Sequence, residues 1–139
     1  MLVRLIYASE ATAAITPVVL DDILRNSRQY NQEHGITGVL CFSGTAFVQV
    51  LEGDRGAVSK LYNRIVKDGR HQRVELLEFS EISERHFAGW TMGQVNLAKI
   101  NPAILLRYLP RAEFDPYSCS SQAILKLVQE LIATAAVNK

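Results

Sequence analysis

A β-hairpin signal constrains the fold of this chain more than any other sequence feature. Two short apolar runs, residues 36–42 and 46–52, are separated only by Ser43-Gly44-Thr45. Such a pattern is typical of two antiparallel strands joined by a tight turn. The segments on either side indicate which other elements accompany the hairpin.

The segment before the hairpin predicts a strand followed by a long helix. Residues 2–9 are rich in apolar and β-favouring types, and their alternation places four side chains on one face: Val3, Leu5, Tyr7 and Ser9. Thr16-Pro17 is typical of a helix start and Gly35 of a helix end, so residues 17–34 are expected to be helical. The inward stripe of this helix is expected to contain Leu20, Ile23, Leu24, Ser27 and Asn31.

The segment after the hairpin predicts a second helix and further strands. Asp54 can cap a helix that runs to about residue 67, and residues 73–82 alternate well enough for a fourth strand. Residues 90–95 could add a short fifth strand. The inward positions of the second helix are Val58, Leu61, Tyr62 and Ile65.

This order of elements predicts an α+β fold. Strand, helix, strand, strand, helix, strand is the split βαβ arrangement of ferredoxin-like folds, with a mixed sheet and two helices on one face. The first and third strands are neighbours in that topology. Tyr7 and Gln49 can therefore meet on the helix-covered face.

The remaining segment, residues 97–139, is expected to be a C-terminal helical extension of the core in residues 1–96, within the same domain. Asn101-Pro102 predicts a short helix to about Tyr108, and residues 110–116 a loop. A last helix is indicated by apolar residues at helical spacing, namely Ile124, Leu127, Val128, Leu131, Ile132 and Ala135. Its stripe is expected to cover the free sheet face; a neighbouring subunit is the alternative.

Charge and hydropathy exclude several classes of function. The 139 residues carry 15 Lys and Arg against 14 Asp and Glu, so the positive excess typical of nucleic-acid binders is absent. No apolar run approaches the roughly 20 residues that cross a bilayer, and Arg4 interrupts the first run too early for an export signal. Cys41 and Cys119 form no CxxC motif and suit a reducing compartment, so a cytoplasmic protein is expected.

Most motifs of catalysis are missing from the chain. GxGxxG, the Walker loop, GxSxG and HExxH are all absent, and Gly35-Ile-Thr-Gly38 is a weak GxxG pattern. The three histidines lack the spacing of a zinc site and are expected to be ordinary surface residues: His34, His71 and His86.

A basic cluster is expected near the end of the second helix, at Arg64, Lys67, Arg70 and His71. These cations can bind a phosphate, or they can simply complement the helix dipole. Arg64 and Asp68 are one helical turn apart and could pair with each other.

Three polar side chains are predicted within the apolar layer between sheet and helices: Tyr7, Asn31 and Gln49. They could satisfy one another in a structural network, or they could line a pocket for a flat ligand with hydrogen-bonding edges. Two further alternatives have the same topology. One is an acylphosphatase-like enzyme that uses Arg64 and Asn31 on a phosphate, and the other is a metabolite-binding regulatory domain.

A series of motifs over residues 1 to about 96 resembles the BLUF family, the blue-light sensors that use flavin. The motifs, in order, are Tyr7, Asn31, Gly35-Ile-Thr-Gly-Val-Leu40, Phe47-Val-Gln-Val-Leu-Glu-Gly53, Arg64-Ile65, Asp68, Arg70-His71 and Trp90-Thr-Met92. The extension is similar to that of the short stand-alone members of the PixD type. Two residues depart from the commonest pattern: Thr91 stands where serine is usual, and Tyr30 where shorter or basic side chains are frequent.

The resemblance implies a cofactor and roles for individual residues. FAD would be held non-covalently between the two helices, with FMN or riboflavin as possible substitutes. Tyr7 and Gln49 would be the photoactive pair, with Trp90 and Met92 beside the glutamine. The other cofactor-binding residues would be Asn31 at the carbonyl and imide edge of the ring, Ile23 and Ile65 on its flanks, and Arg64, Asp68 and His71 toward the ribityl and phosphate end.

The resemblance also implies a function without an enzymatic activity. Light would drive electron and proton transfer from Tyr7 toward the flavin through Gln49, and the glutamine would be left with rearranged hydrogen bonds. The absorption would shift reversibly to the red. The fifth strand would relay this state to a partner protein, and the chain would form a homo-oligomer.

Overall fold

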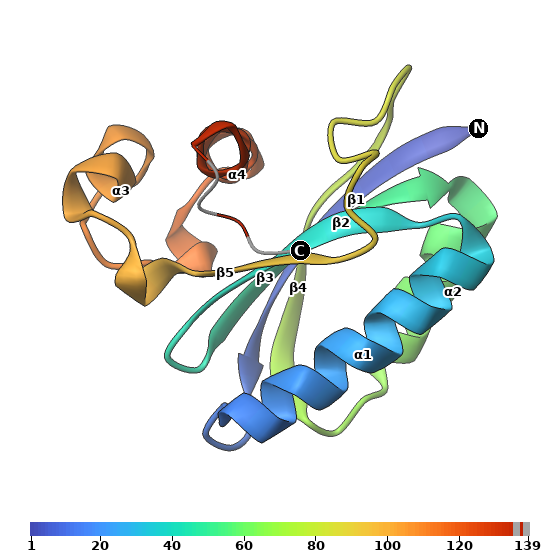
Figure 1. The fold of residues 1–139 in the computed structure, drawn as a ribbon, viewed down its shortest axis with the longest axis horizontal. Helices are drawn as coiled ribbons and strands as arrows, with labels where there is room; N and C mark the ends of the chain where they lie inside the picture. The colour runs from blue at the N-terminus through green and yellow to red at the C-terminus, as the bar shows by residue number, and fades with distance from the viewer. Residues whose placement is uncertain (135–136, 138–139) are drawn as a thin grey trace.

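Five strands form one mixed sheet with helices on both sides (Figure 1). The computed structural model describes residues 1–134 and Val137. In chain order the elements are β1 (Leu2–Ala11), α1 (Pro17–His34), β2 (Thr37–Ser43), β3 (Ala46–Asp54), α2 (Arg55–Val66), β4 (His71–Glu81), β5 (Gly93–Asn96), α3 (Pro102–Tyr108) and α4 (Ser121–Ala133). The strand order is β4-β1-β3-β2-β5, and only the pairing of β2 with β5 is parallel. The predicted ferredoxin-like α+β fold with C-terminal helices is confirmed.

Helix α1 begins and ends where the sequence predicts. The Thr16 hydroxyl accepts a hydrogen bond from the Val19 amide over 3.3 Å, and Pro17 occupies the first turn. Gly35 has a φ of 66°, a left-handed conformation that favours glycine, and its amide donates to the Asn31 carbonyl. Between these caps, Leu24 and Asn31 are the buried residues of the helix.

Gly38 allows the backbones of β2 and β3 to approach closely. A Cβ atom on Gly38 would lie 2.0 Å from the carbonyl oxygen of Val50. Any other residue would therefore push the two strands apart. The second glycine of the Gly-Ile-Thr-Gly segment thus has a packing reason and needs no nucleic-acid ligand.

The sheet separates two hydrophobic clusters. The pocket-side cluster, under α1 and α2, contains Val3, Leu5, Tyr7, Leu24, Ile36, Leu40, Phe47, Leu51, Val58 and Met92. The cap-side cluster joins the other sheet face to α4 and includes Ile6, Ala8, Val39, Cys41, Val48, Val50, Ile124, Leu127, Val128 and Leu131. Figure 1 shows α3 and α4 on the side opposite α1 and α2. The expected cover of the free sheet face by the last helix is present; Ala135 lies outside the described residues.

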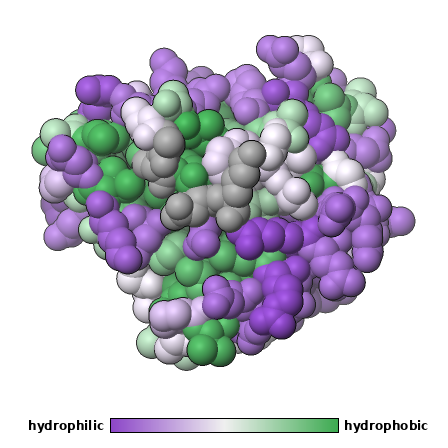
Figure 2. All heavy atoms as spheres, viewed as in Figure 1, coloured by the Kyte–Doolittle hydropathy of each residue, from purple (hydrophilic) through white to green (hydrophobic). Residues whose placement is uncertain are grey.

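Hydropathy of the surface follows this division. Figure 2 shows mostly hydrophilic atoms over α1 and more hydrophobic ones on the side of α3 and α4. Leu106 of α3 is 54% exposed. Within the described residues, no helix is both long and apolar enough to cross a membrane.

Strand β5 begins later than the sequence predicts. The expected start was near Trp90, whereas the strand runs from Gly93 to Asn96. The Trp90 carbonyl still accepts from the Gly38 amide of β2 over 2.9 Å, and the Trp90 amide donates to the Phe87 carbonyl over 3.0 Å. The next two carbonyls, of Thr91 and Met92, accept instead from side chains of α1. Strand β1 also extends two residues beyond its predicted end at Ser9.

A buried ion pair anchors the loop between β4 and β5. Glu52 is fully buried and binds Arg4, which is 7% exposed, with a shortest distance of 2.8 Å. The same carboxylate accepts from the Phe87 amide over 2.8 Å and from the His86 amide over 3.0 Å. Glu52 therefore binds both the neighbouring strand β1, through Arg4, and the loop that leads to Met92.

Candidate functional site

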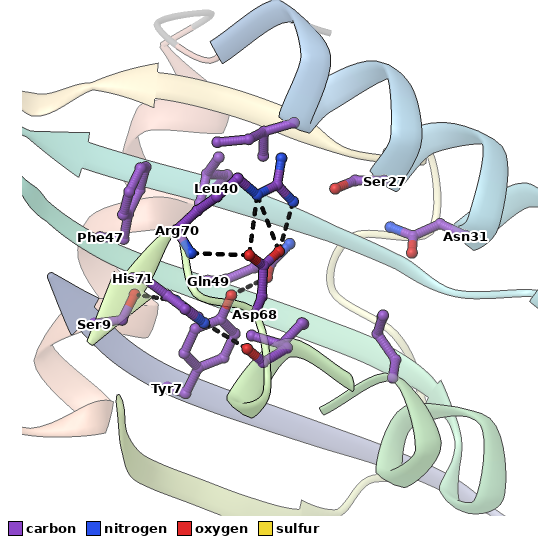
Figure 3. A pocket seen from close by; sticks show the side chains of 13 residues that line it. Tyr7, Ser9, Ser27, Asn31, Leu40, Phe47, Gln49, Asp68, Arg70 and His71 are labelled. Atoms are coloured by element: carbon purple, nitrogen blue, oxygen red, sulfur yellow. Dashed lines mark hydrogen bonds and ion pairs between the residues drawn. The ribbon is translucent and has the colours of Figure 1, made fainter. Parts of the chain in front are cut away.

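A pocket lies between α1, α2 and the helix-covered face of the sheet (Figure 3). It brings together side chains that are far apart in the sequence. The thirteen lining residues are Tyr7, Ser9, Ile23, Ser27, Asn31, Leu40, Phe47, Gln49, Leu61, Ile65, Asp68, Arg70 and His71. Seven of the site residues expected from the sequence are among them: Tyr7, Ile23, Asn31, Gln49, Ile65, Asp68 and His71.

Tyr7 and Gln49 face each other across β1 and β3. They are register partners, and the Tyr7 hydroxyl donates to Gln49 Oε1 over 2.5 Å. Both side chains are buried. Burial raises the pKa of Tyr7 far above its ordinary value, with smaller contributions from Tyr62 and Asp68. The phenol therefore stays protonated at neutral pH and acts as the donor in this bond.

The other end of the Gln49 amide contacts Met92. Gln49 Nε2 donates to the Met92 sulfur over 3.4 Å, and Met92 is buried in the pocket-side cluster. Trp90, two residues earlier, packs against the cap-side cluster instead. The structure thus brings Met92 to the glutamine and directs Trp90 to the opposite face of the sheet.

Asn31 supplies a hydrogen-bond acceptor that is not used within the protein. Its Nδ2 donates to the Thr91 carbonyl over 2.8 Å. Its Oδ1 is buried and has no partner among the described residues. A buried polar atom without a partner costs free energy, so this oxygen fits a ligand that presents an N–H group to the pocket.

His71 is part of the pocket wall. Its Nε2 donates to the Ile65 carbonyl over 2.5 Å, and its Nδ1 lies 3.0 Å from Ser9 Oγ. The ring meets Tyr7 edge to face, with centroids 6.4 Å apart. The expectation of an ordinary surface histidine is therefore wrong for His71. This first residue of β4 bonds the last turn of α2, and its ring is held in the pocket wall.

The end of the pocket near α2 carries an ion pair that the sequence did not predict. Asp68 pairs with Arg70 at 2.6 Å, and the side-chain hydrogen bond from Arg70 is the main reason that the pKa of Asp68 is lowered. The expected pair of Arg64 and Asp68 is not seen. Arg64 lies outside the pocket wall, with its guanidinium 4.5 Å from the centroid of the Tyr30 ring, which in turn stacks on His34.

Six lining residues were not among the expected site residues: Ser9, Ser27, Leu40, Phe47, Leu61 and Arg70. Periodicity had placed Ser9, Ser27 and Leu61 on inward faces, and Arg70 in the basic cluster, without assigning them to the site. Ser9 lies two residues beyond Tyr7 on the same strand face, and Ser27 lies one helical turn before Asn31. Leu40 is the register partner of Gln49 on β2. Within the described residues, no group of three potential ligands could hold a metal ion.

Comparison with known proteins gives consistent matches. The family model described as "Sensors of blue-light using FAD" matches residues 2–93. The photoactivated adenylate cyclase subunit beta of Euglena gracilis is 37% identical over 92 residues, which is 66% of this chain. The match spans only 11% of that relative's own length, so most of that longer protein has no counterpart in this chain.

Solved structures match over nearly the whole chain. The structure titled "BlsA photo-activated state" superimposes with a TM-score of 0.82 at 34% identity, covering 95% of each chain. The dark-state structure of BlrB, described as a BLUF protein, gives a TM-score of 0.78 at 30% identity, covering 96% of each chain. Both matches include the C-terminal helices as well as the sheet.

Proposed function

Because this chain belongs to the BLUF family, the sensors of blue light that use FAD, we propose that it is a blue-light photoreceptor that binds FAD non-covalently in the pocket under α1. The observation that carries the proposal is the buried hydrogen bond from Tyr7 to Gln49 at the floor of that pocket. Packing does not explain this polar pair, because the neighbouring residues of both strands on this face, Ser9 apart, are apolar. FMN or riboflavin could replace FAD, because ring recognition does not depend on the adenine end.

The pocket residues fit the edges of a flavin ring. The unpaired Oδ1 of Asn31 would accept from the imide N–H. Ile23 and Ile65, from the two helices, would provide apolar contact with the ring. Asp68 and His71 would lie toward the ribityl chain, and Arg64, outside the pocket wall, toward the phosphates.

The photochemistry proposed for the chain uses Tyr7 and Gln49. When bound, the flavin would supply a strong oxidant on absorbing blue light. Tyr7 would give an electron to the excited flavin and its phenolic proton toward Gln49 Oε1, the acceptor of its hydrogen bond. The electron and proton would then return to Tyr7 as the charges recombine, so that no net oxidation remains. The Gln49 amide would be left with exchanged hydrogen bonds, by rotation or tautomerisation, and the new arrangement would be the signalling state.

The output proposed for the chain is a protein contact and not a reaction. Met92 connects Gln49 to the start of β5, and Trp90 connects the same segment to the cap-side cluster. A change in this segment would alter the packing of residues 97–139, which we propose as a cap within one domain with the core of residues 1–96. That change would alter the binding of a downstream signalling protein, and the chain would act as a homo-oligomer.

Absorption spectroscopy tests the proposal. The protein reconstituted with FAD should show a flavin spectrum in darkness that moves slightly to the red after blue light and recovers in the dark. Tyr7→Phe should keep the flavin and lose the shift. Tyr62→Phe is the matched control, because its ring lies 5.7 Å from that of Tyr7 without bonding Gln49. A normal photocycle in Tyr7→Phe would refute the assignment.

A further inference from the structure

Two side chains of α1 hold the backbone segment that carries Met92. Asn31 Nδ2 donates to the Thr91 carbonyl over 2.8 Å, and Arg28 Nε donates to the Met92 carbonyl over 3.2 Å. Arg28 and Asn31 are three residues apart and share one helix face, so they reach consecutive carbonyls. The segment precedes β5 and therefore depends on these side chains for its position.

The environment of Arg28 is unusual for a helix-surface arginine. The side chain is half-buried, and its Nη2 is buried with no partner among the described residues. Burying a cationic nitrogen without an acceptor costs free energy, and solvent would ordinarily attract it. Arg28 also lines a small cavity together with Gly89, Trp90, Thr91 and Met92.

We infer that Arg28 is a positioning residue for the photoresponse: by binding the Met92 carbonyl, it keeps the Met92 sulfur against the Gln49 amide. This inference rests on the proposed function. Arg28 is not one of the thirteen side chains that line the pocket, so it acts through Met92 and not on the cofactor. The bond stabilises the arrangement to which the protein returns after illumination.

The same helix offers a matched control for the charge of Arg28. Arg25 lies one turn earlier, and its guanidinium pairs with Asp22 at 2.9 Å. The Arg25 side chain is 73% exposed, and its hydrogen bond goes to Asp22 of the same helix. Arg25→Ala therefore removes one positive charge from α1 without removing a contact to Met92.

The first test is the rate of dark recovery in the FAD-loaded protein. Arg28→Ala is expected to slow recovery about tenfold, since a hydrogen bond from a charged donor is large enough to change a rate constant by that factor. Arg28→Lys, which keeps a charged donor, should recover part of the rate, and Arg25→Ala should match the unaltered protein. Equal rates in Arg28→Ala and the unaltered protein, or equal slowing in Arg28→Ala and Arg25→Ala, would overturn the inference.

A second test does not require a light response, so it separates this inference from the proposed function. The chain has two methionines, Met1 and Met92, and methionine-methyl NMR therefore gives one signal at the site and one distant reference. Arg28→Ala should shift the Met92 signal and leave the Met1 signal in place, whereas Arg25→Ala should shift neither. A Met92 signal that does not respond to Arg28→Ala would overturn the inference even in a protein that shows no photocycle.

Discussion

Gln49 Nε2 donates to the sulfur of Met92 over 3.4 Å, while Gln49 Oε1 accepts from Tyr7 over 2.5 Å. Both ends of one buried amide are therefore engaged by different partners. The phenol can donate or accept, whereas the thioether sulfur can only accept, so it is Met92 that favours this orientation of the amide. An exchange of the two ends would break both bonds at once.

Loss of the sulfur acceptor should slow the return of the amide to this orientation. Met92→Leu conserves volume, so it is expected to cost less than about 1.5 kcal/mol of folding free energy. It leaves Gln49 Nε2 without its acceptor, and dark recovery followed by absorption should be slower. Leu97→Met, a volume-conserving exchange in the cap-side cluster, should recover at the normal rate. Identical recovery in both variants would contradict the role given to the Met92 sulfur.

The raised pKa of Tyr7 should make stability depend on alkaline pH. The unfolded chain releases the phenolic proton near pH 10 and the folded protein keeps it. The free energy of unfolding should therefore fall above about pH 10, by up to ~1.4 kcal/mol per pH unit from this group. Urea denaturation at stepped pH values measures the slope. Tyr7→Phe should show a shallower fall, and an unchanged slope would show that Tyr7 is not the group responsible.

The buried pair of Arg4 and Glu52 should be sensitive to the loss of one partner. Glu52→Gln is expected to lower the free energy of unfolding by about 3–5 kcal/mol, because the Arg4 charge is left buried without compensation. Asp22→Asn, which breaks the exposed pair with Arg25, should cost no more than about 1 kcal/mol. Chemical denaturation of both variants measures the contrast, and similar losses would mean that Glu52 is not a buried anchor.

The C-terminal helix should unfold together with the sheet. Leu131 is fully buried in the cap-side cluster, and Leu131→Ala is expected to cost about 2–5 kcal/mol. The loss of unfolding free energy should appear in a single transition, with the same midpoint whether it is followed by circular dichroism or by release of the ligand from the pocket. Leu106→Ala, at an exposed position of α3, is the control. Two separate transitions would argue against one cooperative domain.

The two cysteines should differ in reactivity. Burial raises the pKa of the Cys41 thiol to about 12, whereas Cys119 is only half-buried, with a pKa raised less by burial. Because the thiolate is the reactive form, iodoacetamide at about pH 8 should modify Cys119 first. Peptide mass mapping identifies the labelled residue, and urea should make both react. Early labelling of Cys41 would show that β2 is more open than described.

Local chemistry explains which elements could be predicted. Helix α1 was predicted with its observed bounds, because Thr16, Pro17 and Gly35 act within a few residues of each end. The meeting of Tyr7 with Gln49 followed from strand alternation and the order of elements. The predicted features thus depend on short-range signals and on a known topology.

Long-range bonds explain what could not be predicted. The start of β5 was misplaced because the carbonyls of Thr91 and Met92 are taken by side chains of α1, some sixty residues away in the chain. Helical spacing suggested Arg64 as a partner of Asp68, and Arg70, two residues after Asp68, was not considered for that pair. Only the turn after α2, which brings Arg70 back over Asp68, decides between them.

The alternation of β3 has a thermodynamic consequence for the cap. Gln49 faces the pocket, while its neighbours Val48 and Val50 face the cluster under α4. A ligand that binds only the folded pocket shifts the folding equilibrium by mass action, by about 2.7 kcal/mol at a hundredfold excess over its dissociation constant. Hydrogen exchange of the α4 amides should slow accordingly, so that this helix reports the occupancy of a pocket that none of its residues lines.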